Sequence, residues 1–171
     1  MPLLIIVSGQ PGSGKSTLAH RLAGALGVPA ICRDELRESL DPDIPDPDLH
    51  VYHVFFSALD LLLGSGVSVL AEAAYQDKLW RPELEKIDAE LRIIRCAADP
   101  AVVRRRFVDR AADGPAHHDA KLVAEIDAGR YPRPGWTPIS VAAPTLDVDT
   151  TDGYRPALAE IISFVRAGPI H

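Results

Sequence analysis

The chain has 171 residues, of which 47% are hydrophobic and 25% charged, a balance that predicts one globular domain with a single core. Its formal net charge of −6 argues against a protein that mainly wraps nucleic acid phosphates, although a local basic groove stays open, and it favours a small or neutral partner. Two cysteines, no charged leader and no apolar run of membrane length predict a reduced, cytoplasmic setting without a membrane partner.

The stretch from Leu3 to Thr17, LLIIVSGQPGSGKST, contains the most specific motif in the sequence. Its apolar first part is too short for a helix and ends at a glycine, which predicts a buried parallel strand. The rest fits the pattern G-x-x-x-x-G-K-[ST], and a helical pattern over roughly 15–26 follows directly. We therefore interpret this stretch as a phosphate-binding loop between a strand and a helix.

A loop of this kind holds a polyphosphate largely through its backbone. Glycines let successive N–H groups close around the anion, where any Cβ would intrude. Lys15 supplies a charge for the β and γ phosphates, the Ser16 hydroxyl can ligate Mg²⁺, and the new helix presents its N-terminus to the anion. The predicted nucleotide-binding positions in the loop are Gly9, Pro11, Gly12, Ser13, Gly14, Lys15, Ser16 and Thr17.

A second strand is predicted over 28–32, after Gly27 ends the first helix. At its exit Asp34 is predicted to cap a short helix, with Arg37 one turn later on the same side. As plain structure, these would be an N-cap and a solvated helix residue. Because open α/β sheets place their ligands at the carboxyl ends of strands, we favour a functional pair that contacts the substrate.

Residues 41–48 alternate proline and aspartate, which predicts a connector into a buried helix over 49–63. A third strand follows over 67–71 and ends in Glu72. An acid at this place, downstream of a phosphate loop, commonly faces Mg²⁺ or its waters, so Ser16 and Glu72 are the predicted metal ligands. An ordinary strand-end acid is the alternative.

The segment after the third strand supplies two candidate substrate contacts. Residues 73–78 predict a loop, in which Asp77 caps a helix that spans 80–89. Tyr75 in this loop and Arg81 on the cleft side of the helix are the candidates.

A fourth strand is predicted over 91–97, and Asp99 opens the helix after it. Arg106 and Arg110 are four residues apart and share one face of that helix. Like charges at this spacing repel by about a few tenths of a kcal/mol unless an anion lies near. Pairing with nearby aspartates into a solvated, salt-bridged face is the alternative. Opposite a triphosphate, arginines on a helical flap would offset the charge on the transferred group.

One further helix over 119–129 completes a small helical lid of approximately 104–130. The segment 130–138 is too rich in proline for regular structure and is interpreted as a cover over the cleft, with its role left open. The residues through which it would act are Tyr131, Arg133 or Trp136.

The last elements are a strand over 144–149, with Thr150 at its exit, and a closing amphipathic helix over 154–166. Backbone groups near Thr150 would hold the adenine ring. Five strands that alternate with helices predict an α/β domain over residues 1–171, in which a parallel, doubly wound sheet is covered by helices on both faces.

Three segments, GQPGSGKST, RDELR and DPAVVRRRFVDR, resemble in order the P-loop kinases that include polynucleotide 5′-kinase, chloramphenicol phosphotransferase and zeta-toxin-like enzymes. The resemblance covers most of the chain and implies a P-loop NTPase fold with strand order 2-3-1-4-5. It further implies that Asp34 accepts the proton of the acceptor hydroxyl and that Arg37 helps hold the acceptor. The lid arginines that contact the nucleotide and the transferred phosphoryl group correspond to Arg106 and Arg110.

The implied strand order separates the two cysteines. With two strands between them, Cys32 and Cys96 would lie roughly 14 Å apart at about 4.8 Å per strand, too far for a disulfide. The chain also departs from the family pattern. Glu72 stands where an aspartate is often found, and the next residues lack the polar pair of the nucleic-acid kinase, which argues against a site for polynucleotide ends.

These features together predict an ATP- and Mg²⁺-dependent kinase that transfers a phosphoryl group to a hydroxyl of a small molecule. In this interpretation, Lys15, Asp34, Arg106 and Arg110 carry the chemistry. A polynucleotide or nucleoside kinase is one alternative, and a nucleotide-binding ATPase or switch without an acceptor is another. The acceptor, the preference for ATP or GTP and the oligomeric state stay open.

Overall fold

The computed structural model describes residues 1–41, 43–113, 117–131 and 134–167. Its centre is a five-stranded parallel sheet with the order β2-β3-β1-β4-β5, which confirms the strand order implied by the family resemblance. The strands are β1 (Leu3–Gly9), β2 (Ala30–Cys32), β3 (Val69–Glu72), β4 (Glu90–Ala97) and β5 (Thr145–Asp149).

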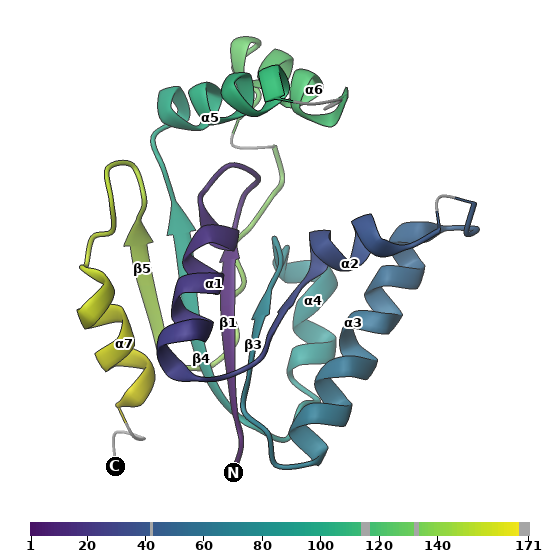
Figure 1. The fold of residues 1–171 in the computed structure, drawn as a ribbon, viewed down its shortest axis with the longest axis vertical. Helices are drawn as coiled ribbons and strands as arrows, with labels where there is room; N and C mark the ends of the chain where they lie inside the picture. The colour runs from purple at the N-terminus through teal and green to yellow at the C-terminus, as the bar shows by residue number, and fades with distance from the viewer. Residues whose placement is uncertain (42, 114–116, 132–133, 168–171) are drawn as a thin grey trace.

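Helices cover both faces of the sheet, as predicted (Figure 1). Helices α3 and α4 pack on one face, and α1 and α7 pack on the other. Two more helices, α5 and α6, lie across the carboxyl ends of the strands (Figure 1). The helices are α1 (Lys15–Leu26), α2 (Arg33–Ser39), α3 (Pro47–Gly64), α4 (Asp77–Leu84), α5 (Pro100–Asp113), α6 (His117–Asp127) and α7 (Leu158–Arg166).

Strand β1 is a continuous apolar run because it is buried on both sides. Leu4 and Ile6 join the core under α3 and α4, whereas Ile5 and Val7 join the core under α1 and α7. A central parallel strand therefore shows no alternation of polar and apolar residues. Because β1 is held in the centre of the sheet, the phosphate loop that follows it begins at the carboxyl edge of the sheet.

Helices α5 and α6 have a small core of their own, separate from the two that flank the sheet. Val103, Phe107 and Leu122 form its buried centre, and Tyr131 packs against it. Asp99 starts α5 as predicted, because its carboxylate accepts from the backbone N–H of Ala101 at 2.8 Å. The segment 104–130 falls on this helical pair, which we call the lid helices, although the lid itself stays a prediction; residues 114–116 lie outside the described part of the chain.

Five predicted helix starts are wrong by one to four residues. Helix α6 begins at His117 and not at 119, and α7 begins at Leu158 and not at 154. Helix α2 begins at Arg33, so Asp34 lies in its first turn and does not cap it. Asp77 is likewise the first residue of α4 and not its cap. Helix α3 begins inside the predicted connector, because the Asp46 side chain accepts from the Leu49 N–H. Acidic residues suit both a cap and a first turn, so the sequence alone does not separate these positions.

The two cysteines are free and buried, with strands β3 and β1 between the strands that carry them. This confirms that they do not form a disulfide. Burial raises the pKa of both the Cys32 and the Cys96 thiols to about 12, so both are protonated at neutral pH. Across the described ranges of the chain, none of the helices combines the length and apolar character needed to cross a membrane.

Candidate functional site

The phosphate loop connects β1 to α1 at the carboxyl end of the sheet (Figure 1). Gly14 precedes the helix with a φ of 75°, a left-handed conformation that side chains rarely adopt. A turn within the loop is closed by the N–H of Ser13, which donates to the carbonyl of Gln10 at 3.1 Å. Helix α1 begins at Lys15 and ends before Gly27, as predicted. The loop thus directs the start of a helix toward the space beyond the strands.

The lid packs directly on this loop. Gly12 has a φ of +79°, and a Cβ there would lie 2.6 Å from Val103 Cγ1 and 2.9 Å from the Phe107 ring. Arg106 donates to the Gly12 carbonyl at 2.9 Å, and Tyr131 donates to the Pro11 carbonyl at 3.0 Å. The glycine at this position is therefore required by the closeness of α5 as well as by its backbone conformation.

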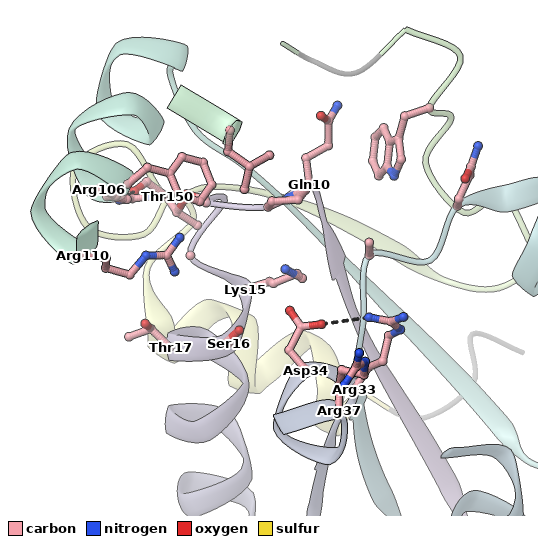
Figure 2. Close-up of a pocket in the computed structure, with 18 of the residues that line it drawn as sticks. Gln10, Lys15, Ser16, Thr17, Arg33, Asp34, Arg37, Arg106, Arg110 and Thr150 are labelled. Carbon is pink, nitrogen blue, oxygen red and sulfur yellow. Dashed lines mark hydrogen bonds and ion pairs between the residues drawn. The ribbon is translucent and has the colours of Figure 1, made fainter. Parts of the chain in front are cut away.

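Thr150 ties the exit of β5 to the same loop. It is 3% exposed, and its hydroxyl donates to the Ser13 carbonyl at 2.6 Å. The Arg106 guanidinium also donates to the Thr150 carbonyl. The predicted site residues Arg106 and Thr150 are thus close together, but both donate hydrogen bonds to backbone carbonyls of the protein itself. Arg110 extends from α5 into the cleft beside the loop, with its guanidinium 4.7 Å from the centre of the Phe107 ring (Figure 2).

Lys15, Ser16 and Glu72 converge below the loop. The Ser16 hydroxyl donates to Glu72 Oε2 at 3.2 Å, and Lys15 Nζ lies 3.5 Å from Glu72 Oε1. The side chains of Lys15 and Glu72 are 8% and 1% exposed. Burial raises the pKa of Glu72, and the nearby charge of Asp34 adds to this, whereas Lys15 and the Ser16 hydrogen bond oppose it.

The donor atoms around Glu72 suit a hard divalent cation. A hydroxyl and a carboxylate are the oxygen ligands that Mg²⁺ prefers. Among the described residues, Glu72 Oε1 is a buried oxygen without a hydrogen-bond partner. A buried carboxylate beside a serine hydroxyl could therefore hold Mg²⁺ at the loop, and the magnesium site stays a prediction.

Asp34 lies across the cleft from the loop, at the start of α2. Figure 2 shows its carboxylate pointing toward Lys15, and an ion pair with Arg33 at 3.1 Å holds it from the other side. Arg33 also donates to Asp48 at 2.9 Å, and Arg37 Nε lies 3.6 Å from the same carboxylate. Asp34 and Arg37 thus both line the cleft and are linked through Arg33 and Asp48 in a four-residue charge cluster.

A single cleft of about 1930 Å³ runs from the loop to α3 and α4. The end beside the loop is lined by Gln10, Pro11, Gly12, Gly14, Lys15, Ser16, Thr17, Arg21, Arg106, Phe107, Asp109, Arg110, Leu122, Thr150, Gly153 and Tyr154. The other end is lined by Arg33, Asp34, Arg37, Glu38, Asp48, Leu49, Tyr52, Ala74, Gln76, Leu79, Trp80, Pro134 and Trp136. We call these the loop half and the helical half of the cleft.

Two candidate substrate contacts do not line the cleft. Tyr75 is fully buried against Phe55 and Trp80, and burial raises its pKa well above the ordinary tyrosine value. Arg81 forms an ion pair with Asp77 on its own helix. The expectation that these two side chains face the substrate is therefore not met in this structure. Arg133, named above for the segment 130–138, lies outside the described residues.

Several residues of the helical half had no role in the sequence-based prediction. Arg33 is the first residue of the RDELR motif, and its position next to Asp34 in the sequence could have indicated the ion pair between them. Asp48 lay in a segment interpreted as a connector, and Trp80 lay in the helix predicted over 80–89 without a role of its own. Their meeting depends on how α2, α3 and α4 lie together, which no local pattern expresses.

A family model described as an AAA domain matches residues 4–130 of the chain. The uncharacterized protein Rv2004c of Mycobacterium tuberculosis is 31% identical over 144 residues, which cover 73% of this chain and 29% of that protein. The chain thus spans less than a third of the length of the curated relatives it matches.

Solved structures share the fold over nearly the whole chain. A candidate kinase from Chloroflexus aurantiacus J-10-fl has a TM-score of 0.82 at 26% identity, covering 96% of this chain and 97% of that one. The APS kinase CysC of Mycobacterium tuberculosis, in complex with AMPPNP and APS, has a TM-score of 0.65 at 19% identity, covering 97% and 98%. The chain therefore has a P-loop kinase fold.

Proposed function

We propose that this chain, which belongs to the AAA domain family, is a kinase that transfers the γ-phosphoryl group of ATP to a hydroxyl of a small molecule. One observation carries the proposal. The Asp34 carboxylate and the phosphate loop with Lys15 face each other across a single cleft. The likeness to a candidate kinase over nearly the whole chain supports it.

The loop half would hold the nucleotide. Backbone N–H groups of the loop and the start of α1 face the β and γ phosphates, and Lys15 adds a positive charge. Mg²⁺, bound by Ser16 and Glu72, would supply charge neutralisation at the phosphate oxygens. Thr150 and the backbone after β5 close the end where the base of the nucleotide would lie.

Asp34 would orient the acceptor hydroxyl and accept its proton. In the transfer, the acceptor oxygen forms a bond to the γ phosphorus while the bond from that phosphorus to the bridging β–γ oxygen breaks, and ADP leaves. The hydroxyl proton passes to the Asp34 carboxylate. Because the transition state is loose, the residues contribute chiefly position and charge.

The two lid arginines would divide their work. Arg106 holds the loop to β5 through the carbonyls of Gly12 and Thr150, which makes it a positioning residue. Arg110 lines the cleft beside Thr17 and would offset the charge on the phosphoryl group in transfer. We further propose that residues 1–171 form one domain whose lid spans approximately 104–130, and that the chain is related to the polynucleotide kinase, chloramphenicol phosphotransferase and zeta-toxin-like group.

The experiment is a search for the phosphorylated product. The protein is incubated with ATP, Mg²⁺ and either a metabolite pool or an oligonucleotide pool, and mass spectrometry detects the gain of one phosphoryl group. We expect a product from the metabolite pool that is absent with Lys15→Ala. A product from the oligonucleotide pool would favour the polynucleotide kinase alternative. If neither pool gains a phosphoryl group, the kinase proposal fails in favour of a nucleotide-binding switch.

A further inference from the structure

The helical half of the cleft has a wall of apolar and aromatic side chains. It is formed by Leu49 and Tyr52 from α3, Leu79 and Trp80 from α4, and Trp136 from the segment after α6. Three separate stretches of the chain thus present apolar surface to one space. Pockets that bind small molecules combine such a wall with a few placed polar groups.

Two residues of this wall, Leu49 and Leu79, are exposed leucines. Leu49 is 51% and Leu79 61% exposed, and both belong to the six large hydrophobic residues most exposed in the described part of the chain. They lie on different helices and line the same cleft. Apolar surface that is grouped in a cleft marks a binding site more often than scattered exposed leucines do.

The wall is held in place from behind. The Trp80 ring lies 4.9 Å from the Tyr75 ring and 5.5 Å from the Phe55 ring, measured between centroids, and both of these rings are fully buried. On the cleft side, the Tyr52 ring lies 5.3 Å from Trp80. The aromatic surface is therefore positioned before any ligand arrives, which lowers the cost of binding a rigid partner.

Four charged groups of this half, from Arg33, Asp34, Arg37 and Asp48, are paired with one another, whereas Glu38 lines the same half without an ion pair to a described residue. Arg33 contacts both Asp34 and Asp48, and Arg37 lies near Asp48. The four paired groups sum to no net charge and Glu38 adds one negative charge, so this half of the cleft does not favour an anionic acceptor. A polar acceptor such as a sugar would leave several hydroxyls without partners against the apolar wall.

We propose that the acceptor is an alcohol with an apolar, preferably aromatic, body, which lies against the Leu49, Leu79 and Trp80 wall while its hydroxyl reaches Asp34. This inference rests on the proposed kinase function and adds the chemical class of the acceptor. The apolar body accounts for binding, and the charge cluster beside the loop orients the reacting oxygen.

Both tryptophans of the chain, Trp80 and Trp136, line this half of the cleft, so intrinsic fluorescence reports its occupation. The probes are 3-phenylpropan-1-ol, hexan-1-ol, glycerol and gluconate, each titrated with AMPPNP and Mg²⁺ present. Transfer from ATP to each alcohol is measured by mass spectrometry. We expect a fluorescence change and transfer with the first two, with kcat/KM at least about tenfold above that for glycerol or gluconate, because each buried methylene adds affinity.

Variants of the wall test its role directly. Leu79→Ser and Leu49→Ser should each lower kcat/KM for 3-phenylpropan-1-ol about tenfold, because each substitution removes apolar surface that the acceptor would cover. Leu61→Ser is the matched control, since Leu61 is 71% exposed on α3 and does not line the cleft. None of the three should change the affinity for AMPPNP or the melting temperature, because all three side chains are exposed.

The outcomes separate this inference from the proposed function. Preferred transfer to glycerol or gluconate would overturn the apolar acceptor and leave the kinase function standing. Equal behaviour of Leu79→Ser and Leu61→Ser would also overturn it. Absence of transfer to these probes and to every compound of the metabolite pool would overturn both.

Discussion

The loop half and the helical half of the cleft are built in different ways. The loop half has the consecutive residues 9–17 at its centre, with backbone groups whose placement depends on glycine conformations, and side chains from α5, α6 and the exit of β5 complete it. The helical half uses side chains from α2, α3, α4 and the segment 134–136. The phosphate loop is therefore encoded by neighbouring residues, whereas the helical half, where we propose that the acceptor binds, depends on how distant segments pack.

The largest effect on nucleotide affinity should come from the charge at the centre of the loop half. Lys15→Ala removes an ammonium group from the phosphates, so we expect the affinity for Mg²⁺·AMPPNP to fall about 10- to 100-fold, the range for a hydrogen bond to a charged group. Titration calorimetry measures this. Fluorescence titration of the helical half with 3-phenylpropan-1-ol should be unchanged, and a parallel loss there would break the comparison.

A fold control accompanies this variant, because Lys15→Ala leaves the buried Glu72 carboxylate without its cation. The double variant Lys15→Ala with Glu72→Gln removes both charges. It should regain thermal stability without regaining nucleotide affinity.

The sequence was sufficient to place the phosphate loop itself, residues 9–17, for a physical reason. The strand β1, the loop and α1 follow a motif in which each residue acts on its neighbours, and the predicted bounds of α1 at 15–26 are confirmed. Ser16 and Glu72 were paired in advance because an acid at a strand end downstream of a phosphate loop commonly faces the metal, and the two side chains are in fact hydrogen-bonded. The strand order, by contrast, came from the family resemblance, since periodicity within a strand says nothing about its neighbour.

The next effect in size concerns the contact between loop and lid. Gly12→Ala places a methyl group 2.6 Å from Val103, so we expect a loss of about 1–3 kcal/mol in the free energy of unfolding from overpacking, together with weaker binding of AMPPNP. Gly66→Ala is the matched control, because Gly66 has the same φ of +79° and open space around it. Thermal unfolding of both variants isolates the packing from the strain of the left-handed backbone. Equal losses would show that the lid does not constrain the loop.

A smaller effect should follow the titration of Glu72. Burial raises the pKa of Glu72. As the pH is lowered, its carboxylate is therefore protonated at a higher pH than an ordinary glutamate, and the protonated group no longer binds a metal. The affinity for Mg²⁺·AMPPNP should fall by no more than about tenfold per pH unit there, since one proton is involved. Glu72→Gln should bind more weakly and without this dependence.

The same raised pKa has the opposite sign for folding. The folded protein binds the proton more readily than the unfolded chain, so the contribution of Glu72 to stability is fully present below its ordinary pKa. It is lost as the pH rises through the raised value. Melting temperatures without nucleotide, compared between wild type and Glu72→Gln across this range, check the sign. A contribution that grows with pH would contradict it.

The smallest effect concerns Tyr75, which lies behind the wall of the helical half. Its hydroxyl is a buried group without a hydrogen-bond partner among the described residues. Tyr75→Phe should therefore stabilise the protein by about 1 kcal/mol and leave kcat and KM unchanged. A rise in KM for the acceptor would show instead that the Tyr75 hydroxyl reaches the substrate, as the sequence had suggested.

The errors in the helical half have a common physical origin. Tyr75 was predicted to face the substrate because it follows β3, but its backbone has a φ of 45° and its ring enters the core beside Phe55. Leu49 was assigned to a buried helix, yet it faces the cleft. Such outcomes depend on the packing of α3 and α4 on the sheet. Local patterns of hydrophobicity do not contain that information.

The division of the cleft is tested most directly by Asp34→Asn, with transfer and nucleotide affinity measured in the same preparation. The acceptor is the alcohol identified in the metabolite pool. The account predicts that the affinity for Mg²⁺·AMPPNP stays within about threefold of wild type, while the rate of phosphoryl transfer falls by about 10²- to 10⁴-fold, the range for loss of a general base. Transfer at the wild-type rate, or a loss of nucleotide affinity that matches the loss of transfer, would contradict it.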